Sequence, residues 1–314
     1  MNICITGALG HIGSKLIRNL DIPSLKTVHL VDNFLTQRYV SLFNLPDKPR
    51  FIFHETDILS EEMKDIVNDS HVIIHLAAIT DAESSVQKKD LVETVNKKGF
   101  KNVVDFASLY NRPVIFPSTT SVYGSQSELV DENCLELQPQ SPYAESKIWA
   151  ERYLKSLGKK GKLKYVILRL GTIFGYSIGM RFHTAVNKFI FQAVTGQEIT
   201  VWKTAYNQKR PYCDLNDAIS AINFSIEHKI FDNEIYNIVT INSTVEDIVK
   251  VIKYHIPHLK VKFVESRIMN QLSYEVSNLK SLKRGFSYKG NLKKSIKETI
   301  EKLKNVNSFV TKNL

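Results

Sequence analysis

The sequence predicts an α/β protein built on a doubly wound parallel sheet with a smaller mixed α/β lobe. Short β-branched, apolar runs alternate with helical stretches through roughly the first half of the chain. The run His71-Val-Ile-Ile-His-Leu76 is typical of a strand buried on both faces. A glycine-rich turn joins the first such run to the first helical stretch. Repeated strand–helix alternation implies parallel strands covered on both faces.

The first half supplies the sheet and its covering helices. Strands are expected at 2–6, 27–31, 51–54, 71–76, 113–116 and 165–168. Helices are expected at 10–20, 86–110 and 143–157, and Pro142 fits the start of the last one.

The second half is less regular. Helices are expected at 181–195, 215–227, 245–255 and 293–304, with strands at 199–202, 235–239 and 260–264. We expect residues 1–170, with returning segments at about 212–240, to form the sheet domain. Residues 171–211 and 241–314 would form the smaller lobe.

Composition narrows the class of protein. The 314 residues are 43% hydrophobic and 24% charged, which suits a globular protein with an ample core. No apolar run approaches the ~18 residues of a membrane span, and the N-terminus lacks the pattern of a signal peptide. Three scattered cysteines indicate neither a disulfide framework nor a metal site, so no metal and a reducing cytoplasm are expected.

The net charge of +10 is spread thinly along the chain. Its densest stretches, 158–164 and 293–304, read as a solvated loop and the outer face of an amphipathic helix. We therefore expect no nucleic-acid partner and no membrane. The positive charge would attract an anionic, phosphate-bearing substrate as well as it would attract a nucleic acid.

The glycine-rich turn is a candidate phosphate-binding loop. In Thr6-Gly-Ala-Leu-Gly-His-Ile-Gly13, glycines permit a tight turn and close approach of a pyrophosphate. The spacing is G-x-x-G-x-x-G, not the usual G-x-G-x-x-G. Asp32 ends the second strand, where a carboxylate accepts from ribose hydroxyls and repels a 2′-phosphate, so NAD is favoured over NADP. Arg38 could alter that preference, but it reads as a helix-face arginine. Asp57 is placed to flank the adenine or to cap a turn.

Tyr143 and Lys147 form a candidate proton-transfer pair. Their spacing puts the phenol and the ammonium on one helix face, one turn apart. A nearby cation lowers the pKa of a phenol, which can then exchange a proton with a substrate hydroxyl. By itself this spacing is weak evidence, because the chain has 13 tyrosines and many lysines.

Together these segments resemble the extended short-chain dehydrogenase/reductase family, in its NAD-dependent nucleotide-sugar epimerase/dehydratase branch. The resemblance implies a Rossmann-type doubly wound parallel sheet with a smaller mixed α/β substrate lobe. It rests on the glycine loop and on further motifs in the family's order: Val31-Asp-Asn33, Asp57-Ile58, His75-Leu-Ala-Ala78, Asn96, Pro117-Ser-Thr-Thr-Ser-Val-Tyr-Gly124, the Tyr143/Lys147 pair, Arg169-Leu-Gly-Thr-Ile-Phe-Gly175, Arg210-Pro-Tyr-Cys-Asp214 and Tyr236-Asn-Ile238.

The resemblance assigns roles to single residues. Thr119 would hydrogen-bond the reacting sugar oxygen, Tyr143 would remove the hydroxyl proton, and Lys147 would lower the pKa of Tyr143 and bind the nicotinamide ribose. NAD would be held by Gly7, Gly10, His11, Ile12, Gly13, Asp32, Asn33, Asp57, Ile58, Leu76, Ala77, Ala78, Asn96, Tyr143, Lys147 and Leu170. The substrate would be held by Thr80, Thr120, Ser121, Thr172, Arg181, Asn187, Arg210 and Arg267.

Departures from the family pattern restrict the reaction. The 4,6-dehydratases of the family carry Asp-Glu directly after the catalytic threonine, and the decarboxylating relatives keep the Glu. Thr120 and Ser121 stand here instead, and neither is a carboxylate acid or base. Oxidation at C4 remains, with or without return of the hydride.

The first interpretation is a dehydrogenase that releases a 4-keto sugar nucleotide for a surface polysaccharide, and the alternative is a 4-epimerase. A non-catalytic NAD-binding regulator is a third hypothesis, disfavoured because Thr119, Tyr143 and Lys147 are all present. The substrate would carry GDP or UDP. Family members dimerise through the helices expected at 86–110 and 143–157, so a homodimer or larger homo-oligomer is expected.

Overall fold

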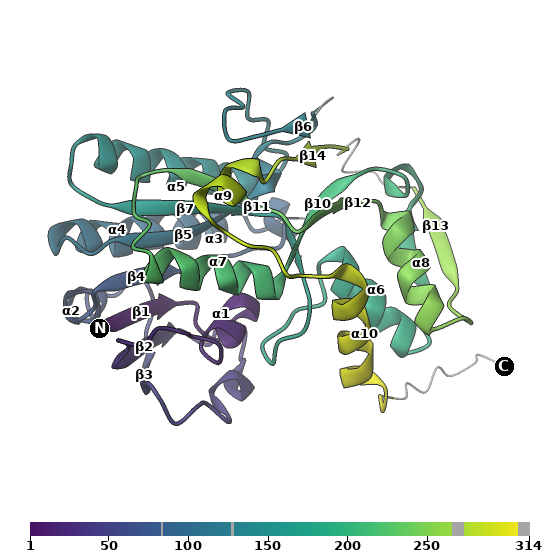
Figure 1. Cartoon of the computed structure of the whole chain (residues 1–314), viewed down its shortest axis with the longest axis horizontal. Helices are drawn as coiled ribbons and strands as arrows, with labels where there is room; N and C mark the ends of the chain where they lie inside the picture. Colours follow the sequence, from purple (N-terminus) through teal and green to yellow (C-terminus); the bar gives the residue numbers. More distant parts are fainter. Residues whose placement is uncertain (83, 127–128, 266–272, 307–314) are drawn as a thin grey trace.

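The computed structural model describes residues 1–82, 84–126, 129–265 and 273–306. A seven-stranded, fully parallel sheet lies at its centre, in the order β3-β2-β1-β4-β5-β7-β11 (Figure 1). Its strands are β1 (Asn2–Thr6), β2 (Thr27–Asp32), β3 (Arg50–Glu55), β4 (Val72–His75), β5 (Val114–Thr119), β7 (Tyr165–Leu170) and β11 (Ile235–Ile238). The order reverses between β1 and β4, so the sheet is of the doubly wound, Rossmann type.

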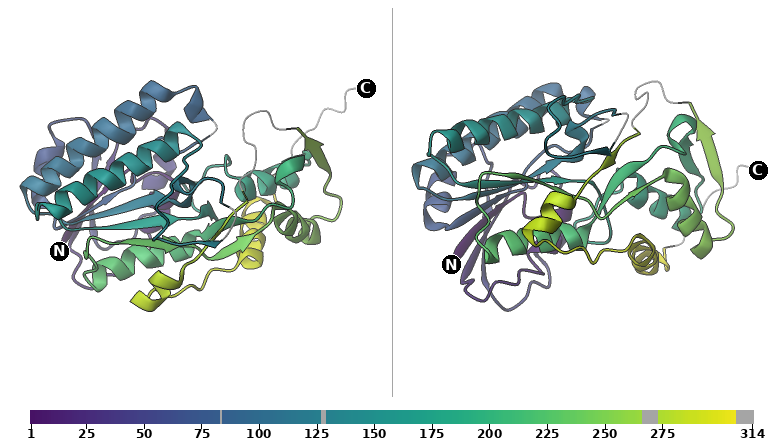
Figure 2. Two further views of the ribbon diagram at one scale, coloured as in Figure 1. Left: turned by 90° about the horizontal axis from the view of Figure 1, so that it is seen from above. Right: turned by 45° about the horizontal axis from the view of Figure 1, so that its top comes forward.

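Helices cover both faces of this sheet, as Figure 2 shows most clearly in its left-hand view. The helices α2 (Met63–Asp69), α4 (Phe100–Leu109) and α5 (Pro142–Lys159) share one apolar core with one face of the sheet. The helices α1 (His11–Leu16) and α7 (Leu215–Glu227) share another with the opposite face. Both predicted layers are therefore present. The first helix is shorter than the expected 10–20.

The long helix expected at 86–110 is a composite. It runs from α3 (Lys89–Val92) through a π-helical stretch, Glu93–Gly99, into α4. The buried Asn96 lies in that stretch, where its side chain bonds both backbone groups of Ile79 and the hydroxyl of Ser146. A π-helical turn changes the direction of side chains relative to an α-helix, which a 3.6-residue periodicity cannot indicate.

The smaller lobe packs around an apolar core of its own. It contains a three-stranded sheet and a two-stranded sheet, and a further short strand pair joins it to the chain after β5. The three-stranded sheet consists of β8 (Thr172–Phe174), β10 (Arg210–Asp214) and β12 (Ile241–Ser243), and the two-stranded sheet of β9 (Ile199–Trp202) and β13 (Val261–Val264). The short strand pair is β6 (Leu129–Val130) with β14 (Glu275–Val276). The helices of the lobe are α6 (Ala185–Val194), α8 (Val245–His255) and α10 (Leu292–Leu303). The helix α9 (Leu279–Arg284) packs beside β11.

Local chemistry sets several boundaries of the lobe. Thr244 and Asp247 form a capping box that starts α8 where the sequence predicts it. The helix expected at 181–195 begins only at Ala185, and residues 181–184 precede it as extended or irregular chain along the wall of a cavity.

Two buried carboxylates hold the C-terminal segment onto the sheet domain. Asp217 accepts hydrogen bonds from the backbone N–H groups of Lys289 and Gly290, at 2.8 Å each. Asp214 caps α7 and also accepts from the hydroxyl of Ser295 on α10, at 2.5 Å. The start of α7 and the start of α10 are thereby tied together.

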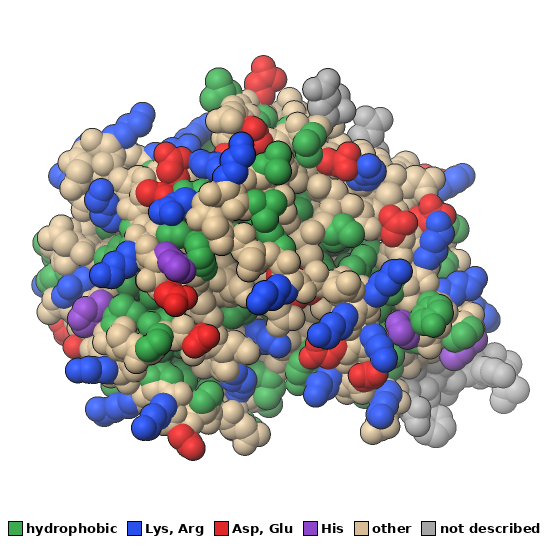
Figure 3. Space-filling model, viewed as in Figure 1, with side chains coloured by type: hydrophobic (Ala, Val, Ile, Leu, Met, Phe, Trp, Pro, Cys, Tyr) green, Lys and Arg blue, Asp and Glu red, His purple; other side chains and the backbone are tan. Residues whose placement is uncertain are grey.

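Positive charge is distributed across the surface. Lys and Arg side chains are interspersed with Asp and Glu over the face shown in Figure 3, and do not form one continuous patch there. In the described ranges, no helix has both the length and the apolar character of a membrane span.

Candidate active site

One cavity of about 1060 Å³ lies where the carboxyl ends of the central strands face the smaller lobe. This is the place where open α/β sheets bind ligands. All the predicted cofactor-binding residues except Asn96 line it: Gly7, Gly10, His11, Ile12, Gly13, Asp32, Asn33, Asp57, Ile58, Leu76, Ala77, Ala78, Tyr143, Lys147 and Leu170. Asn96 instead holds the segment around Ile79, so it supports the cavity wall without lining it.

The glycine loop leaves no room for side chains at two positions. Gly7 has a φ of +66°, and a Cβ built on it would lie 2.6 Å from the backbone nitrogen of Ala77. A Cβ on Gly13 would overlap the carbonyl of Ala8. The loop is therefore packed directly against the end of β4, and its backbone forms one wall of the cavity.

Gly7→Ala is expected to weaken NAD binding by about tenfold or more. The added methyl group must move Ala77, and alanine also resists a positive φ. Titration of NADH fluorescence would measure the effect. Gly161→Ala is the matched control, since Gly161 has the same φ but no neighbour within 4 Å and lies outside the cavity. Equal affinities in both variants would contradict the packing argument.

The residues at the predicted adenosine end of the site are polar and hydrogen-bonded to one another or to nearby backbone. The Asp32 carboxylate accepts from the N–H groups of Leu9 and Phe34, at 3.2 and 3.1 Å, while burial raises its pKa. Asn33 donates to Asp57 at 2.8 Å. Asp32 is thus bound to the glycine loop and faces the same cavity.

Arg38 is not the helix-face arginine that the sequence suggested. It precedes a 3₁₀ turn, Tyr39–Leu42, and its Nη1 donates to the carbonyl of Gly179 in the smaller lobe at 2.8 Å. Arg38 lines the cavity near Gly10. This contact joins segments 141 residues apart, which explains why local periodicity missed it.

Thr119, Tyr143 and Lys147 converge at the centre of the cavity. The Thr119 hydroxyl accepts from the N–H of Ser121 and donates to its hydroxyl, both at 3.1 Å. Burial raises the pKa of Tyr143 to about 12, while the Thr119 hydroxyl and the charge of Arg181 act to lower it. Tyr143 is consequently protonated at neutral pH in the protein without ligands.

Lys147 is held between Tyr143 and the sheet. Its ammonium donates to the carbonyl of Pro117 at 2.8 Å and lies 4.5 Å from the centre of the Phe116 ring. Burial lowers the pKa of Lys147 to about 7, although the charge of Glu151 raises it. Small changes in local charge therefore decide whether Lys147 is an ammonium near neutral pH.

His75 is fully buried beneath this group. Its Nδ1 lies 3.0 Å from the Thr6 hydroxyl, and its ring packs edge-on against Phe100. Burial, followed by the charge of Lys147, lowers the pKa of His75 to about 3. His75 therefore stays neutral in the folded protein at any pH where the protein would function.

A neutral buried His75 makes the fold sensitive to acid. Its pKa is depressed below the unfolded value of ~6.5, so its contribution to stability is lost as the pH falls below that value. Between pH 7 and pH 5 we expect His75 alone to account for a loss of about 2 kcal/mol in unfolding free energy. Urea unfolding at both values should show that loss reduced in His75→Asn and unchanged in the exposed-site control His228→Asn. An undiminished loss in His75→Asn would refute this assignment.

Five of the predicted substrate-binding residues also line the cavity: Thr80, Ser121, Thr172, Arg181 and Arg210. Three of their polar atoms, Thr80 Oγ1, Arg181 Nε and Arg210 Nε, are buried without a hydrogen-bond partner in the described part of the chain. Buried donors and acceptors normally have hydrogen-bond partners, so these unpartnered atoms indicate that the cavity binds a polar ligand.

The remaining predicted substrate residues lie elsewhere. Thr120 is buried outside the cavity lining, and Asn187 is used internally, accepting from the N–H of Gly175 and donating to the carbonyl of Arg181. Arg267 lies outside the described residues. Sequence reasoning missed Tyr274, which lines the cavity and donates to the carbonyl of Thr120 at 3.2 Å. No motif surrounds Tyr274, and contacts with distant segments place it: β14 pairs with β6, and the N–H of Tyr274 donates to the carbonyl of Lys209 at 3.1 Å.

Comparison with known proteins identifies the family. Residues 3–239 match the model of the NAD dependent epimerase/dehydratase family. The chain belongs to this family. As the family's name states, its members depend on NAD, and the lining residues of this member fit that cofactor. Gly7, Gly10 and Gly13 line the cavity without side chains, which suits close approach of a pyrophosphate, and Asp32 offers a carboxylate to ribose hydroxyls.

Relatives within the epimerase/dehydratase family include several activities. The chain is 29% identical over 261 residues to a putative UDP-glucose 4-epimerase of Methanocaldococcus jannaschii, covering 81% of this chain and 82% of that protein. It is 30% identical over 248 residues to the UDP-N-acetyl-alpha-D-glucosaminuronate decarboxylase of Bacillus cytotoxicus, covering 74% and 73%.

Solved structures show the same fold along almost the whole chain. The UDP-glucuronic acid 4-epimerase from Bacillus cereus, in complex with UDP-glucuronic acid and NAD, superposes with a TM-score of 0.88 at 24% identity over 97% of this chain and 99% of that chain. The UDP-glucose 4-epimerase of Thermus thermophilus, in complex with NAD, gives 0.84 at 23% over 98% and 100%.

Proposed function

We propose that the protein is an NAD-dependent UDP-sugar 4-epimerase. The observation that carries the proposal is the cluster of Thr119, Tyr143 and Lys147 in one cavity, with Nζ of Lys147 5.9 Å from the centre of the Tyr143 ring and no carboxylate at position 120 or 121. Such a site can move one proton at a sugar hydroxyl, and hydroxyl side chains occupy the two positions where the dehydratases of the family carry carboxylates. The decarboxylating members of the family keep a glutamate at the position of Ser121, so among the activities of the relatives the 4-epimerases suit this set of groups better.

The chain's own residues would divide the work as follows. Bound NAD supplies the acceptor and donor of the hydride at C4. Tyr143 would act as the phenolate, favoured by the neighbouring cations Lys147 and Arg181; it would take the proton of the C4 hydroxyl and later give it back, while the Thr119 hydroxyl would orient the same oxygen. Arg210, at the start of β10, would bind the diphosphate of the substrate, and its Nε, which has no hydrogen-bond partner in the described structure, is available for that contact. Cations and hydroxyls thus surround an anionic substrate.

Product analysis tests this proposal against net oxidation, the interpretation that the sequence alone placed first. The purified protein would be incubated with UDP- and GDP-linked hexoses and hexuronic acids, with C4 deuterated. An isobaric product of opposite C4 configuration that retains the deuterium supports the epimerase. A product that has lost two hydrogens, with NADH accumulating, would establish a 4-dehydrogenase instead. If neither the UDP-linked nor the GDP-linked sugars changed, the proposal that the protein is an enzyme acting on nucleotide sugars would be refuted.

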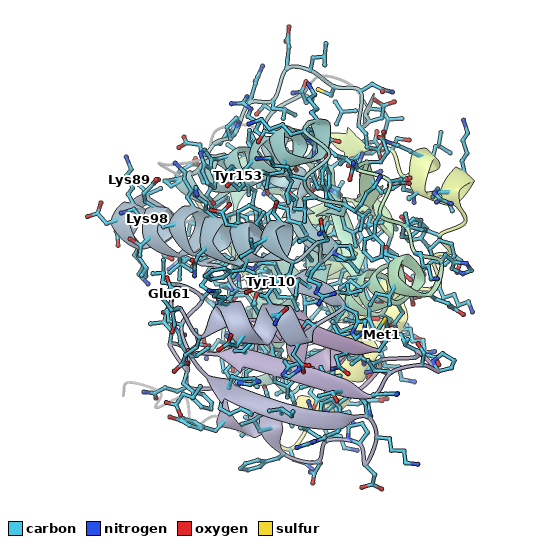
Figure 4. The ribbon with its side chains drawn as sticks, turned by 90° about the vertical axis from the view of Figure 1, so that its left-hand side faces the viewer. Met1, Glu61, Lys89, Lys98, Tyr110 and Tyr153 are labelled. Carbon is cyan, nitrogen blue, oxygen red and sulfur yellow. The ribbon has the colours of Figure 1, made fainter. Side chains whose placement is uncertain are left out.

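The proposal includes a homodimer. The helices α4 and α5 lie side by side on the face shown in Figure 4, with Tyr153 on α5 and Tyr110 at the end of α4. On this face Trp149 and Tyr153 stack with ring centres 5.4 Å apart, and Leu109 is 62% exposed. Exposed apolar groups of this kind suit a four-helix interface with a second copy. Light scattering that gave the mass of a single chain would contradict this part.

Cellular context completes the proposal. The free thiols Cys4, Cys134 and Cys213 suit a reducing cytoplasm, and we retain a surface polysaccharide as the destination of the product.

A further inference from the structure

A row of polar side chains crosses the buried sheet just below the candidate active site. Ser118 on β5, Arg169 on β7 and Asn237 on β11 are in register with one another. All are 3% exposed or less, whereas Phe116, Ile167 and Ile235 belong to an apolar core on the same face. Buried polar groups destabilise a fold unless they are paired, so this row requires partners.

Glu151 on α5 is the principal partner. Its Oε1 accepts from the Ser118 hydroxyl at 2.6 Å and from Nε of Arg169 at 3.0 Å, and its Oε2 accepts from Nη2 of Arg169 at 2.6 Å. The guanidinium lies 4.9 Å from the Tyr123 ring centre, and the Tyr123 hydroxyl donates to Asn237 at 2.9 Å. The result is one connected buried network with a bidentate ion pair at its centre.

This network lies next to every group of the proposed reaction. Ser118 immediately precedes Thr119, and Glu151 follows Lys147 by one helical turn and Tyr143 by two. The hydrogen bond from Ser118 to Glu151 therefore ties the helix that carries Tyr143 and Lys147 to the strand that carries Thr119, and the ion pair with Arg169 ties the same helix to the neighbouring β7.

The charged and titratable groups around Lys147 give Glu151 a second effect. Tyr143 and Glu151 face Lys147 from its own helix, and His75 faces it from β4. His75 is neutral for the reason given above. Arg169 faces Glu151 from the other side. Burial lowers the pKa of Lys147, and Glu151 provides the charge that raises it.

We propose that Glu151 is a positioning residue for the reaction. Through Ser118 and Arg169 it fixes α5 against β5 and β7, and its negative charge, one helical turn from Lys147, favours the ammonium form of Lys147 beside Tyr143. This inference deepens the proposed function and rests on it for the roles of Tyr143 and Lys147.

The test compares Glu151→Gln with Glu145→Gln, which makes the same change at an exposed position of the same helix. Lysine labelled at Cε allows Lys147 to be titrated by NMR, with Lys147→Met assigning its signal. We expect Glu151→Gln to lower the titration point of Lys147 by about one pH unit. We also expect kcat to fall about tenfold while KM changes less than about threefold, and Glu145→Gln to match the wild type in both measurements.

The double variant Glu151→Met/Arg169→Met separates positioning from simple stability. It removes both charges together, so it avoids leaving Arg169 buried and unpaired, and should recover thermal stability relative to Glu151→Gln. The proposal requires the double variant to keep the low kcat and the lowered Lys147 titration point. Wild-type kcat and titration in a stable double variant would overturn it, as would an unshifted Lys147 in Glu151→Gln.

The two proposals can fail separately. Absence of turnover in the wild type would count against the epimerase, while the Lys147 titrations would still decide the electrostatic role of Glu151.

Discussion

Tyr143→Phe is expected to slow turnover by about a thousandfold while leaving the fold and NAD binding intact. The substitution removes one hydroxyl, which the proposal uses to move the proton of the C4 hydroxyl, and such groups contribute roughly 10²–10⁴ to a rate. The ring stays in place, and Lys147 keeps its hydrogen bond to Pro117. The hydride cannot leave C4 readily while its oxygen keeps the proton.

Three measurements on this variant are needed together. kcat for the epimerised sugar, NADH affinity and the thermal unfolding midpoint distinguish a lost catalytic group from a damaged fold. Tyr153→Phe removes a hydroxyl from the same helix, one that bonds Asp105 away from the cavity, and should keep kcat within about twofold of the wild type. If Tyr143→Phe turned over at the wild-type rate, the proton would have to pass through another group.

The fold was predictable where local pattern decides it. The strands of the parallel sheet are short apolar runs, and α7 and α8 have the bounds that apolar periodicity predicts. The three-stranded sheet of the lobe was not predicted. Its strand β10 contains Pro211, and its pairing with β8 and β12 joins distant segments of the chain.

The same distinction holds for the candidate site. The glycine loop and the Tyr143/Lys147 spacing are local and were found from the sequence. Tyr274 and the Glu151–Arg169 ion pair come from separate elements and have no local signature. Asn96 matched a motif, yet motif matching does not say whether an amide contacts a ligand or bonds the backbone beside it, as Asn96 does here.

Lys147→Met is expected to slow turnover by about a hundredfold and, at the same time, to stabilise the cofactor-free protein at pH 7. Turnover slows because the variant loses the Lys147 cation, 5.9 Å from the centre of the Tyr143 ring, and the phenolate is then favoured by the charge of Arg181 without that of Lys147. The variant is expected to be more stable than the wild type because the wild type buries an ammonium, and in the described structure that ammonium donates one hydrogen bond, to the carbonyl of Pro117. Methionine has a similar length and no charge to bury.

The pH dependence of the difference in unfolding free energy between Lys147→Met and the wild type shows whether the buried ammonium causes it. The folded pKa of Lys147 is about 7, against ~10.5 in the unfolded chain, so the unfolded state binds more protons between these values. Wild-type stability therefore rises with pH across this window. The advantage of Lys147→Met should be about 4 kcal/mol at pH 7 and should vanish near pH 10.5. Urea unfolding of both proteins from pH 6.5 to 10 measures it. A variant less stable than the wild type at pH 7 would contradict this explanation, because it would mean that Glu151 and Pro117 fully compensate the buried ammonium.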